Sequence, residues 1–198
     1  MSAADPSFPT LEHCTGIPYE CRCFRVVDLE AYTGVDTPTL LFDLGPKISK
    51  GGQRLSPSGD HRGLYVSAEL QTAGAEYADG SDNWIKGRCG QYVVSNIDLR
   101  LSSMLDLTDK AVRRTLKISK ATVQAPWTGF ADLNGGEWPP TWKLGHEVFA
   151  SGRFDGILFP STKKNGGTCL LVFTEHLVKG ETAVSILKAK GEIWGKLP

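Results

Sequence analysis

Five polar side chains of the sequence could together bind a phosphorylated sugar and act on it. They are two arginines, a tyrosine, a glutamate and a serine: Arg25, Arg54, Tyr65, Glu76 and Ser161. Guanidinium groups make charge-assisted, often bidentate hydrogen bonds to phosphate oxygens. A carboxylate stabilises positive charge that develops on a sugar, a tyrosine ring stacks on a flat cationic base, and a hydroxyl holds a ribose or phosphate oxygen.

Each of these residues also has an ordinary structural interpretation. Arg25 could form a surface ion pair, and Tyr65 could be a half-buried core aromatic, as is common for tyrosine in a strand. Glu76 lies to one side of the apolar face of its predicted helix and could face solvent, and Ser161 could begin a turn after Pro160. The functional interpretation therefore depends on the combination of residues.

The elements that must position these residues are short. Alternating and β-branched residues predict strands at 21–28, 64–67, 91–99, 154–160, 168–174, 183–188 and 192–195. Helices are expected after Ser67, Thr108 and Thr141, where a hydroxyl can cap the first turn. Because regular alternation of strands with long crossover helices is missing, the sequence predicts an α+β fold with a mixed or split sheet in a single domain.

The connection over residues 44–63 is long and rich in glycine and proline, and it carries Arg54. Such loops are usually functional or disordered. Glycines let a backbone approach phosphate closely and adopt positive φ angles. The small residues 73–75 let the following helix pack near a ligand, so that Glu76 can reach it.

The overall composition argues against several classes of protein. The 198 residues include 22 Lys+Arg and 22 Asp+Glu, whereas a protein that grips nucleic-acid backbone usually shows a basic excess. No stretch approaches the roughly 20 apolar residues that span a bilayer. Residues 1–15 are polar and predict a loose tail without a signal peptide, followed by one domain over residues 16–198. The five cysteines then indicate reduced thiols and a cytoplasmic location.

Neither a metal site nor an acyl-transfer site is expected. Cys21 and Cys23 would share one face of a strand, but no second Cys/His pair lies nearby at zinc-like spacing. The four histidines are scattered, and no Ser-His-Asp or Cys-His order is present. His61, in the glycine-rich loop, is interpreted as a solvated loop residue.

Two segments of the sequence resemble the RES domain family. One is GGQR…GLYVSAELQTAGAEY, which spaces Arg54, Tyr65 and Glu76 eleven residues apart, and the other is FDGILFPST followed by CLLVF. The resemblance runs from about Arg25 to about Phe173. Members of this family, named for an Arg, a Glu and a Ser, are toxins of bacterial toxin–antitoxin pairs. Their fold is related to that of ADP-ribosyltransferases, and they consume NAD+ by glycohydrolysis or phosphorolysis.

The resemblance implies a role for each of the five residues, with NAD+ as the substrate. Glu76, Arg25 and Ser161 would be catalytic, and Arg54, Tyr65 and again Ser161 would bind substrate. The two guanidinium groups suit the pyrophosphate, and Tyr65 would stack on the nicotinamide. Glu76 would hold the ribose 2′-hydroxyl and orient the incoming water or phosphate. The loop departs from the family pattern, since it reads GGQRLSP instead of a Gly-Arg-Trp type of sequence.

Two alternatives to NAD+ degradation stay open at this point. One is a mono-ADP-ribosyltransferase that modifies a cellular protein, and the other is a catalytically silent NAD-binding or interaction module, which the altered loop around Arg54 would allow. The resemblance also implies a helix-turn-helix antitoxin as partner, bound over the cleft. The sequence does not specify the acceptor, delivery into another cell or assembly into a homo-oligomer.

Overall fold

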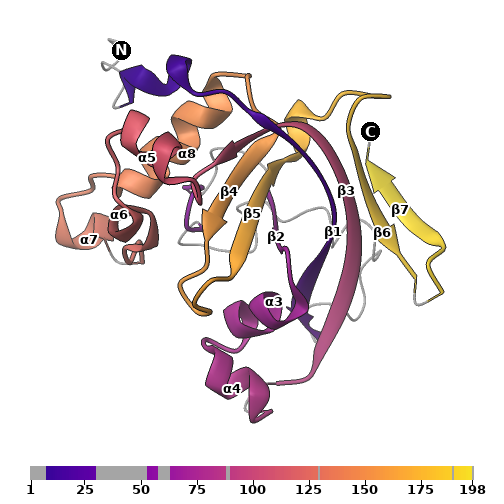
Figure 1. The fold of residues 1–198 in the computed structure, drawn as a ribbon. Coiled ribbons are helices and arrows are strands. Elements are labelled where there is room, and N and C mark those ends of the chain that lie inside the picture. The colour runs from indigo at the N-terminus through magenta and orange to yellow at the C-terminus, as the bar shows by residue number, and fades with distance from the viewer. Residues whose placement is uncertain are drawn as a thin grey trace.

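Within the described residues, seven strands form a mixed sheet that folds back on itself (Figure 1). The computed structural model describes residues 8–29, 53–57, 63–87, 90–128, 130–188 and 190–197. The strands are β1 (Ile17–Asp28), β2 (Gly63–Ser67), β3 (Tyr92–Asp106), β4 (Gly156–Pro160), β5 (Thr168–Phe173), β6 (Ala183–Leu187) and β7 (Ile193–Leu197). The order β1-β2-β5-β4-β3-β6-β7 is supplemented by a direct pairing of β1 with β3.

The long strand β3 pairs with three other strands, β1, β4 and β6, and so joins the two parts of the sheet that contain β4 and β6. It pairs antiparallel with β1 along most of its length and with β6 over residues 96–100. Its last residues, 104–106, pair with β4 in the one parallel ladder of the described sheet. The pairings β1–β2–β5–β4–β3–β1 therefore close a circuit, and β6 with β7 extends away from it. The predicted α+β fold with a mixed, split sheet is confirmed.

The helices are short and occupy two regions. They are η1 (Pro9–His13), α3 (Leu70–Tyr77), α4 (Ser81–Ile85), α5 (Lys110–Thr115), α6 (Lys120–Gln124), α7 (Phe130–Leu133), α8 (Pro140–Ala150) and η2 (Thr174–His176). Helices α5 to α8 gather beside β4, whereas α3 and α4 lie at the opposite end of the molecule, near β1 and β3 (Figure 1). None of the described helices has the length and hydropathy needed to cross a membrane.

All three predicted helix caps are wrong. Thr141 lies within α8, after its N-cap Pro139, and does not cap it. Ser67 ends β2 in register with Cys169, and its hydroxyl lies 3.8 Å from the Cys169 sulfur, so Glu69 takes the N-cap position of α3. The helix expected after Thr108 is capped by Asp109, whose carboxylate accepts a hydrogen bond from the Ala111 N–H. At Ser67 and Thr108 a neighbouring acidic residue occupies the cap because the sheet or the preceding turn fixes the hydroxyl elsewhere.

The core lies on both faces of β4 and β5. Along β5, Leu170 and Val172 point into a cluster shared with β3 and β6, while Leu171 and Phe173 point into a second cluster under the helices. Successive side chains of a strand point to opposite faces. Burial of both faces explains why residues 168–173 read as a continuous apolar run without alternation.

The segment predicted as a loose tail packs against this core from residue 8 onward. Phe8, Leu11 and Cys14 belong to the cluster under the helices. The Arg153 guanidinium donates to the backbone carbonyls of Leu11 (2.9 Å) and Cys14 (3.0 Å). The expectation of a loose tail is therefore wrong for residues 8–14, because three apolar side chains dispersed among polar ones are enough to anchor the segment. Residues 1–7 lie outside the described part of the chain.

Asp155, within the FDGILFP segment, has a structural role. Its buried carboxylate accepts hydrogen bonds from the Ser102 N–H (2.7 Å), the Ser102 hydroxyl (2.8 Å) and the Ser103 N–H (2.9 Å). These residues lie where β3 passes from its pairing with β6 to its pairing with β4. Asp155 thus fixes the place at which the two parts of the sheet diverge.

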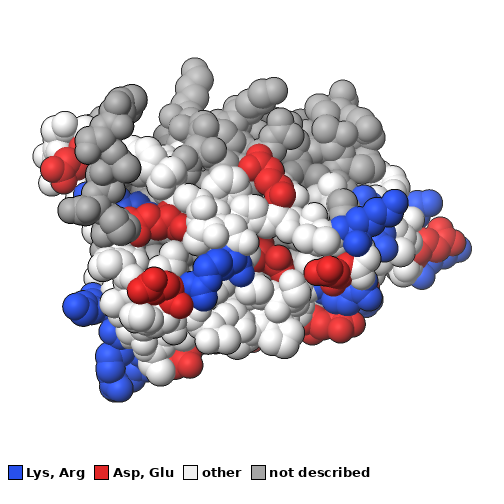
Figure 2. Space-filling view, turned by 90° about the horizontal axis from the view of Figure 1, so that it is seen from above, with Lys and Arg blue, Asp and Glu red and all other residues white. Residues whose placement is uncertain are grey.

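Charged side chains are interspersed on the surface shown in Figure 2. Lysine and arginine alternate there with aspartate and glutamate, and no large area of that face carries a single sign of charge among the coloured residues. This distribution agrees with the equal numbers of acidic and basic residues in the sequence.

Candidate active site

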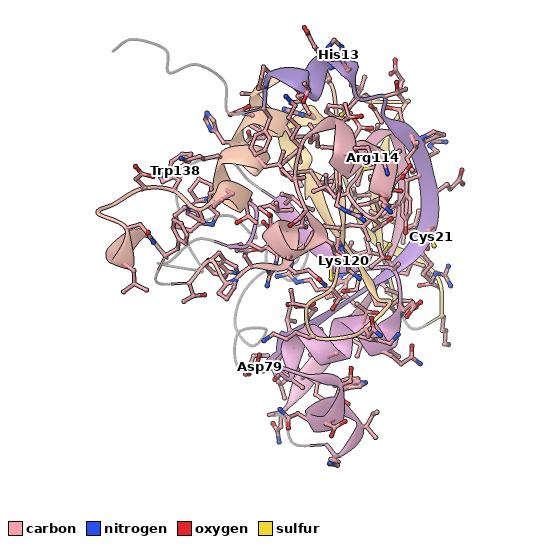
Figure 3. All side chains as sticks on the ribbon, turned by 60° about the vertical axis from the view of Figure 1, so that its left-hand side comes forward. His13, Cys21, Asp79, Arg114, Lys120 and Trp138 are labelled. Atoms are coloured by element: carbon pink, nitrogen blue, oxygen red, sulfur yellow. The ribbon has the colours of Figure 1, made fainter. Side chains whose placement is uncertain are left out.

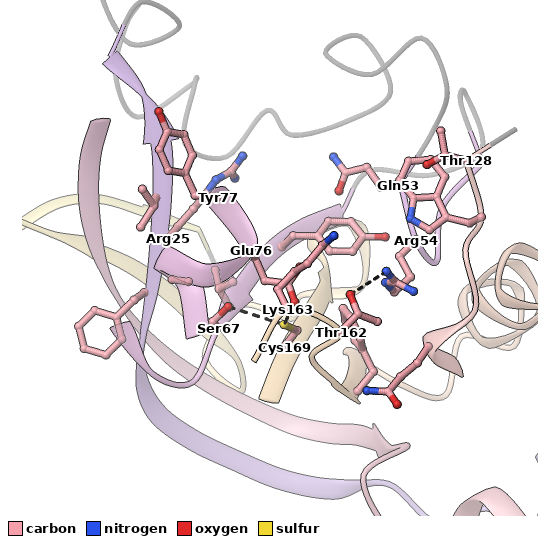
Figure 4. A pocket seen from close by; sticks show the side chains of 18 of the residues that line it. Arg25, Gln53, Arg54, Ser67, Glu76, Tyr77, Thr128, Thr162, Lys163 and Cys169 are labelled. Atoms are coloured by element: carbon pink, nitrogen blue, oxygen red, sulfur yellow. Dashed lines mark hydrogen bonds between the residues drawn. The ribbon is translucent and has the colours of Figure 1, made fainter. Parts of the chain in front are cut away.

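A pocket of about 630 Å³ contains four of the five predicted residues. Arg25 comes from β1, Tyr65 from β2, Glu76 from the last turn of α3, and Arg54 from the turn over residues 53–56 (Figure 4). Cavities of about 300–1,000 Å³ are typical of small-molecule and cofactor sites. The pocket therefore has the size and the side chains of a site for a phosphorylated ligand.

Ser161, the fifth residue, lies behind Glu76 and does not line the pocket. Its hydroxyl donates to Glu76 Oε1 at 2.5 Å and accepts from the N–H groups of Lys163 (3.1 Å) and Lys164 (3.0 Å). A serine hydroxyl has one proton and two lone pairs, and all three are used here. The side chain is 3% exposed. In this arrangement Ser161 positions the carboxylate and has no free group for a ligand.

Cys169 is a second support for the same carboxylate, and sequence analysis did not identify it. Its thiol donates to Glu76 Oε1 over 3.6 Å. Burial, and then the Glu76 charge, raise the pKa of Cys169 to about 12, so the thiol stays protonated near neutral pH and remains a donor. Oε1 is thus held from two sides, while Oε2 accepts no hydrogen bond from a described residue.

Arg25 is a half-buried cation without a counterion among the described residues. Its Nη1 atom is buried and has no hydrogen-bond partner there. Burial lowers the pKa of the Arg25 guanidinium, because desolvation disfavours the charged form. An unpaired buried charge is costly unless a ligand compensates it. An anion bound in the pocket would supply that compensation.

Arg54, in contrast, is mostly engaged by the protein itself. Its Nη1 donates to the carbonyls of Ala125 (3.1 Å) and, more weakly, Val123 (3.5 Å), and its Nη2 donates to Thr162 Oγ1 (3.1 Å). Burial lowers the pKa of Arg54, and the Glu76 charge opposes this effect. Arg54 therefore joins its own turn to the end of α6 and to the segment after β4, and part of its guanidinium remains for a ligand.

Tyr65 forms part of the pocket wall and anchors the turn that carries Arg54. Its hydroxyl accepts from the Leu55 N–H at 3.2 Å and lies 3.0 Å from Ser56 Oγ. Its ring packs edge-on against Phe159, with centroids 6.3 Å apart. Burial raises the pKa of Tyr65 to about 12, so the hydroxyl remains protonated.

Several other pocket residues were not predicted. They include Gln53, Tyr77, Gln124, Trp127, Thr128 and Lys163. Gln124 Nε2 donates to the Ser161 carbonyl at 2.7 Å, and Lys163 forms an ion pair with Asp79. The aromatic loop over residues 125–140 was the available sequence signal for Trp127, but nothing local showed that this loop borders the site.

The described residues contain no group of three or more His, Cys, Asp or Glu side chains that could hold a metal ion. Cys21 is exposed on β1 (Figure 3), whereas Cys23 is buried. His61 and Cys89 fall outside the described residues, as does most of the glycine-rich loop.

Comparisons with known proteins agree with this architecture. No curated protein matches the sequence. One chain in the crystal structure of the M. tuberculosis MbcT–MbcA toxin–antitoxin complex superposes with a TM-score of 0.63 at 16% sequence identity, over 98% of this chain and 91% of that one. At this identity the likeness establishes a shared fold. The RES domain matches residues 18–190, which is most of the sequence, and the chain therefore belongs to the RES domain family.

Proposed function

We propose that the protein is an NAD+-consuming toxin that cleaves the bond between nicotinamide and ribose. The observation that carries the proposal is the presence, in one pocket, of a carboxylate held by Ser161 and of a half-buried Arg25 that has no counterion among the described residues. NAD+ has the complementary chemistry, since it joins a diphosphate to a ribose that carries a cationic leaving group. Membership of the RES domain family supports the same assignment.

Glu76 would act on the nicotinamide ribose. As the C1′–N bond breaks, its electron pair moves to the ring nitrogen, nicotinamide leaves as a neutral molecule, and positive charge develops on the ribose. The Oε2 atom of Glu76, which no described residue engages, can hold the 2′-hydroxyl and stabilise this charge. The acceptor then adds an oxygen to C1′ and loses a proton.

The acceptor decides between the possible reactions, and product analysis identifies it. Protein incubated with NAD+ in phosphate-free buffer should release nicotinamide and ADP-ribose if water is the acceptor. Phosphorolysis would require added phosphate and yield a phosphorylated ADP-ribose, and a protein acceptor would gain the mass of ADP-ribose. Intact NAD+ in every condition would contradict the proposal, and binding without turnover would indicate a silent NAD-binding module.

We also propose that an antitoxin protein regulates this activity, since the structural neighbour was solved as a toxin–antitoxin complex. The partner would bind over the pocket, and a helix-turn-helix protein is the expected type. Expression of the chain alone should inhibit growth, and co-expression of the cognate protein should restore it.

Ser161→Ala should lower kcat about 10–100-fold with a smaller change in KM. The substitution removes one charge-assisted hydrogen bond from Glu76, worth about 1.5–3 kcal/mol, and leaves the carboxylate less well placed. It also deprives two backbone N–H groups of their acceptor, so thermal stability should fall. Steady-state kinetics and thermal unfolding measure the two effects.

Ser161→Thr keeps the hydroxyl and should recover most of the lost kcat. If Ser161→Ala instead raised KM and left kcat unchanged, the hydroxyl would be a substrate ligand and its assignment as a positioning group would be wrong.

Gly145→Ala should reduce both activity and stability. A Cβ atom at this position of α8 would lie 1.8 Å from the Leu55 carbonyl oxygen, so the turn that carries Arg54 must move. Overpacking of this kind costs about 1–3 kcal/mol. Gly152→Ala is the control: its φ of 62° makes alanine unfavourable, but a Cβ there meets no atom within 4 Å. That variant should lose stability and retain kcat, and equal activity losses in the two variants would contradict the assigned role of the turn.

A further inference from the structure

The pocket has two chemically different ends, on either side of Glu76. Figure 4 shows Arg25 and Tyr77 at one end and Arg54 and Thr128 at the other. NAD+ is also unsymmetric about the ribose at the scissile bond, because nicotinamide extends in one direction and the diphosphate with adenosine in the other. The contacts at each end indicate which part of the dinucleotide it accepts.

The end near Arg25 is the better phosphate site. Nη1 of Arg25 is buried and has no hydrogen-bond partner in the part of the chain that the structure describes, whereas Arg54 already donates to the carbonyls of Val123 and Ala125 and to Thr162. A phosphate oxygen beside Arg25 would satisfy an orphaned donor and neutralise an uncompensated charge. The same oxygen beside Arg54 would meet a guanidinium whose donors are largely in use, so it would gain less.

The opposite end carries a large aromatic wall. Trp127 is half-buried and lines the pocket, and its ring packs against Trp142 with centroids 6.2 Å apart. Trp142 Nε1 donates to the Gln53 carbonyl at 2.6 Å, and Arg54 holds the Ala125 carbonyl two residues before Trp127. The indole thus packs against a supported ring and borders the pocket.

We infer that Trp127 is the platform on which the cationic nicotinamide ring stacks, so that NAD+ binds with nicotinamide toward Trp127 and its diphosphate toward Arg25. This inference rests on the proposed function. Tryptophan gives the strongest cation–π attraction of the aromatic side chains. Tyr65, which the sequence suggested for this role, also lines the pocket, and its hydroxyl anchors the turn at Leu55.

The inference predicts an effect on KM more than on kcat. The ring is cationic in bound NAD+ and becomes neutral as the C1′–N bond breaks, so stacking on Trp127 stabilises the ground state at least as much as the transition state. Loss of the indole therefore weakens substrate binding without removing an interaction specific to the transition state. Trp127→Ala should raise KM roughly tenfold, with kcat within about threefold of the wild type.

Trp138→Ala is the matched control. Trp138 packs against Trp142 in the same aromatic cluster, with centroids 6.3 Å apart, but it does not line the pocket and is 36% exposed (Figure 3). This variant disturbs the cluster from its outer side and should leave KM unchanged. A rise in KM as large as that of Trp127→Ala would mean that the cluster acts only structurally and would overturn the assignment.

Binding of substrate fragments tests the orientation directly. Nicotinamide methylated on its ring nitrogen represents the cationic end, and AMP represents the phosphate and adenosine end. Calorimetry should show that Trp127→Ala weakens binding of the methylated nicotinamide roughly tenfold and leaves binding of AMP unchanged. Arg25→Met should weaken binding of AMP and leave binding of the methylated nicotinamide unchanged. Loss of AMP binding in Trp127→Ala with unchanged methylnicotinamide binding, or no effect on either fragment, would overturn the inference.

The fragment experiment is independent of catalysis. If wild-type protein binds both fragments as expected but leaves NAD+ intact, the proposed cleavage fails while the orientation stands. If NAD+ is cleaved but the fragments respond in the opposite way, the function stands and the orientation is wrong.

Discussion

Glu76→Gln is expected to lower the rate of NAD+ cleavage by at least 10²–10³-fold while the protein stays folded. In other enzymes, removal of a preorganised group that faces developing charge lowers the rate by about this factor. Glutamine preserves the shape of the side chain and an oxygen that can accept from Ser161, but it removes the negative charge beside the ribose. Initial rates of NAD+ loss, compared with thermal unfolding of the same samples, measure the effect.

Glu69→Gln is the control for this substitution. Glu69 caps the same helix at its other end and forms an exposed ion pair with Lys164 at 3.0 Å. Exposed pairs of this kind contribute about 0–1 kcal/mol, so the variant should keep its activity and nearly all of its stability. In cells, Glu76→Gln should remove growth inhibition and Glu69→Gln should retain it. A fully active Glu76→Gln protein would exclude the carboxylate from the reaction.

Arg25→Met should weaken NAD+ binding and raise the stability of the unliganded protein. Removal of a half-buried cation that has no counterion among the described residues is expected to stabilise the unliganded protein. The same change removes the phosphate ligand and should weaken NAD+ binding at least tenfold. Chemical unfolding and titration calorimetry check the two effects.

The stability that Arg25→Met gains over the wild type should decrease at high pH. Burial lowers the pKa of Arg25 to about 9, below its ordinary value, so the unfolded chain binds more protons at this group than the folded chain. The wild type is therefore fully destabilised by the charged Arg25 below pH 9. This destabilisation decreases as the pH rises above 9. The gain of Arg25→Met should shrink in that range.

Arg22→Met on the same strand is the control. Arg22 is exposed and paired with Asp98 at 2.8 Å, so its removal should bring no stabilisation and no loss of NAD+ binding. An Arg25→Met protein that is less stable than the wild type would show that the guanidinium has a structural partner.

The sequence predicted those features of the fold and site that depend on local pattern. The apolar runs that became β4 and β5, and the strands predicted at 183–188 and 192–195 that became β6 and β7, follow from strand periodicity. The spacing of Arg54, Tyr65 and Glu76 indicated one site, and the structure brings these side chains together in one pocket.

The features that the sequence could not predict depend on contacts between distant segments. The sequence suggested substrate contact for Ser161 but did not reveal that α3, 85 residues earlier in the chain, presents Glu76 to its hydroxyl. The sequence suggested Arg54 as a phosphate ligand but did not reveal that its guanidinium also donates to carbonyls about 70 residues away. The residue type identifies a hydrogen-bond donor, but only the tertiary structure shows which acceptor it bonds.

The most direct test of the central claim follows nicotinamide release and NAD+ binding in the same pair of proteins. Wild-type protein should convert NAD+ to free nicotinamide in equal molar amounts, as observed by NMR. Glu76→Gln should bind NAD+ with similar affinity in calorimetry and release essentially none. Release of nicotinamide at comparable rates by both proteins, or no release by the wild type with every acceptor supplied, would contradict the claim that Glu76 drives cleavage of this bond.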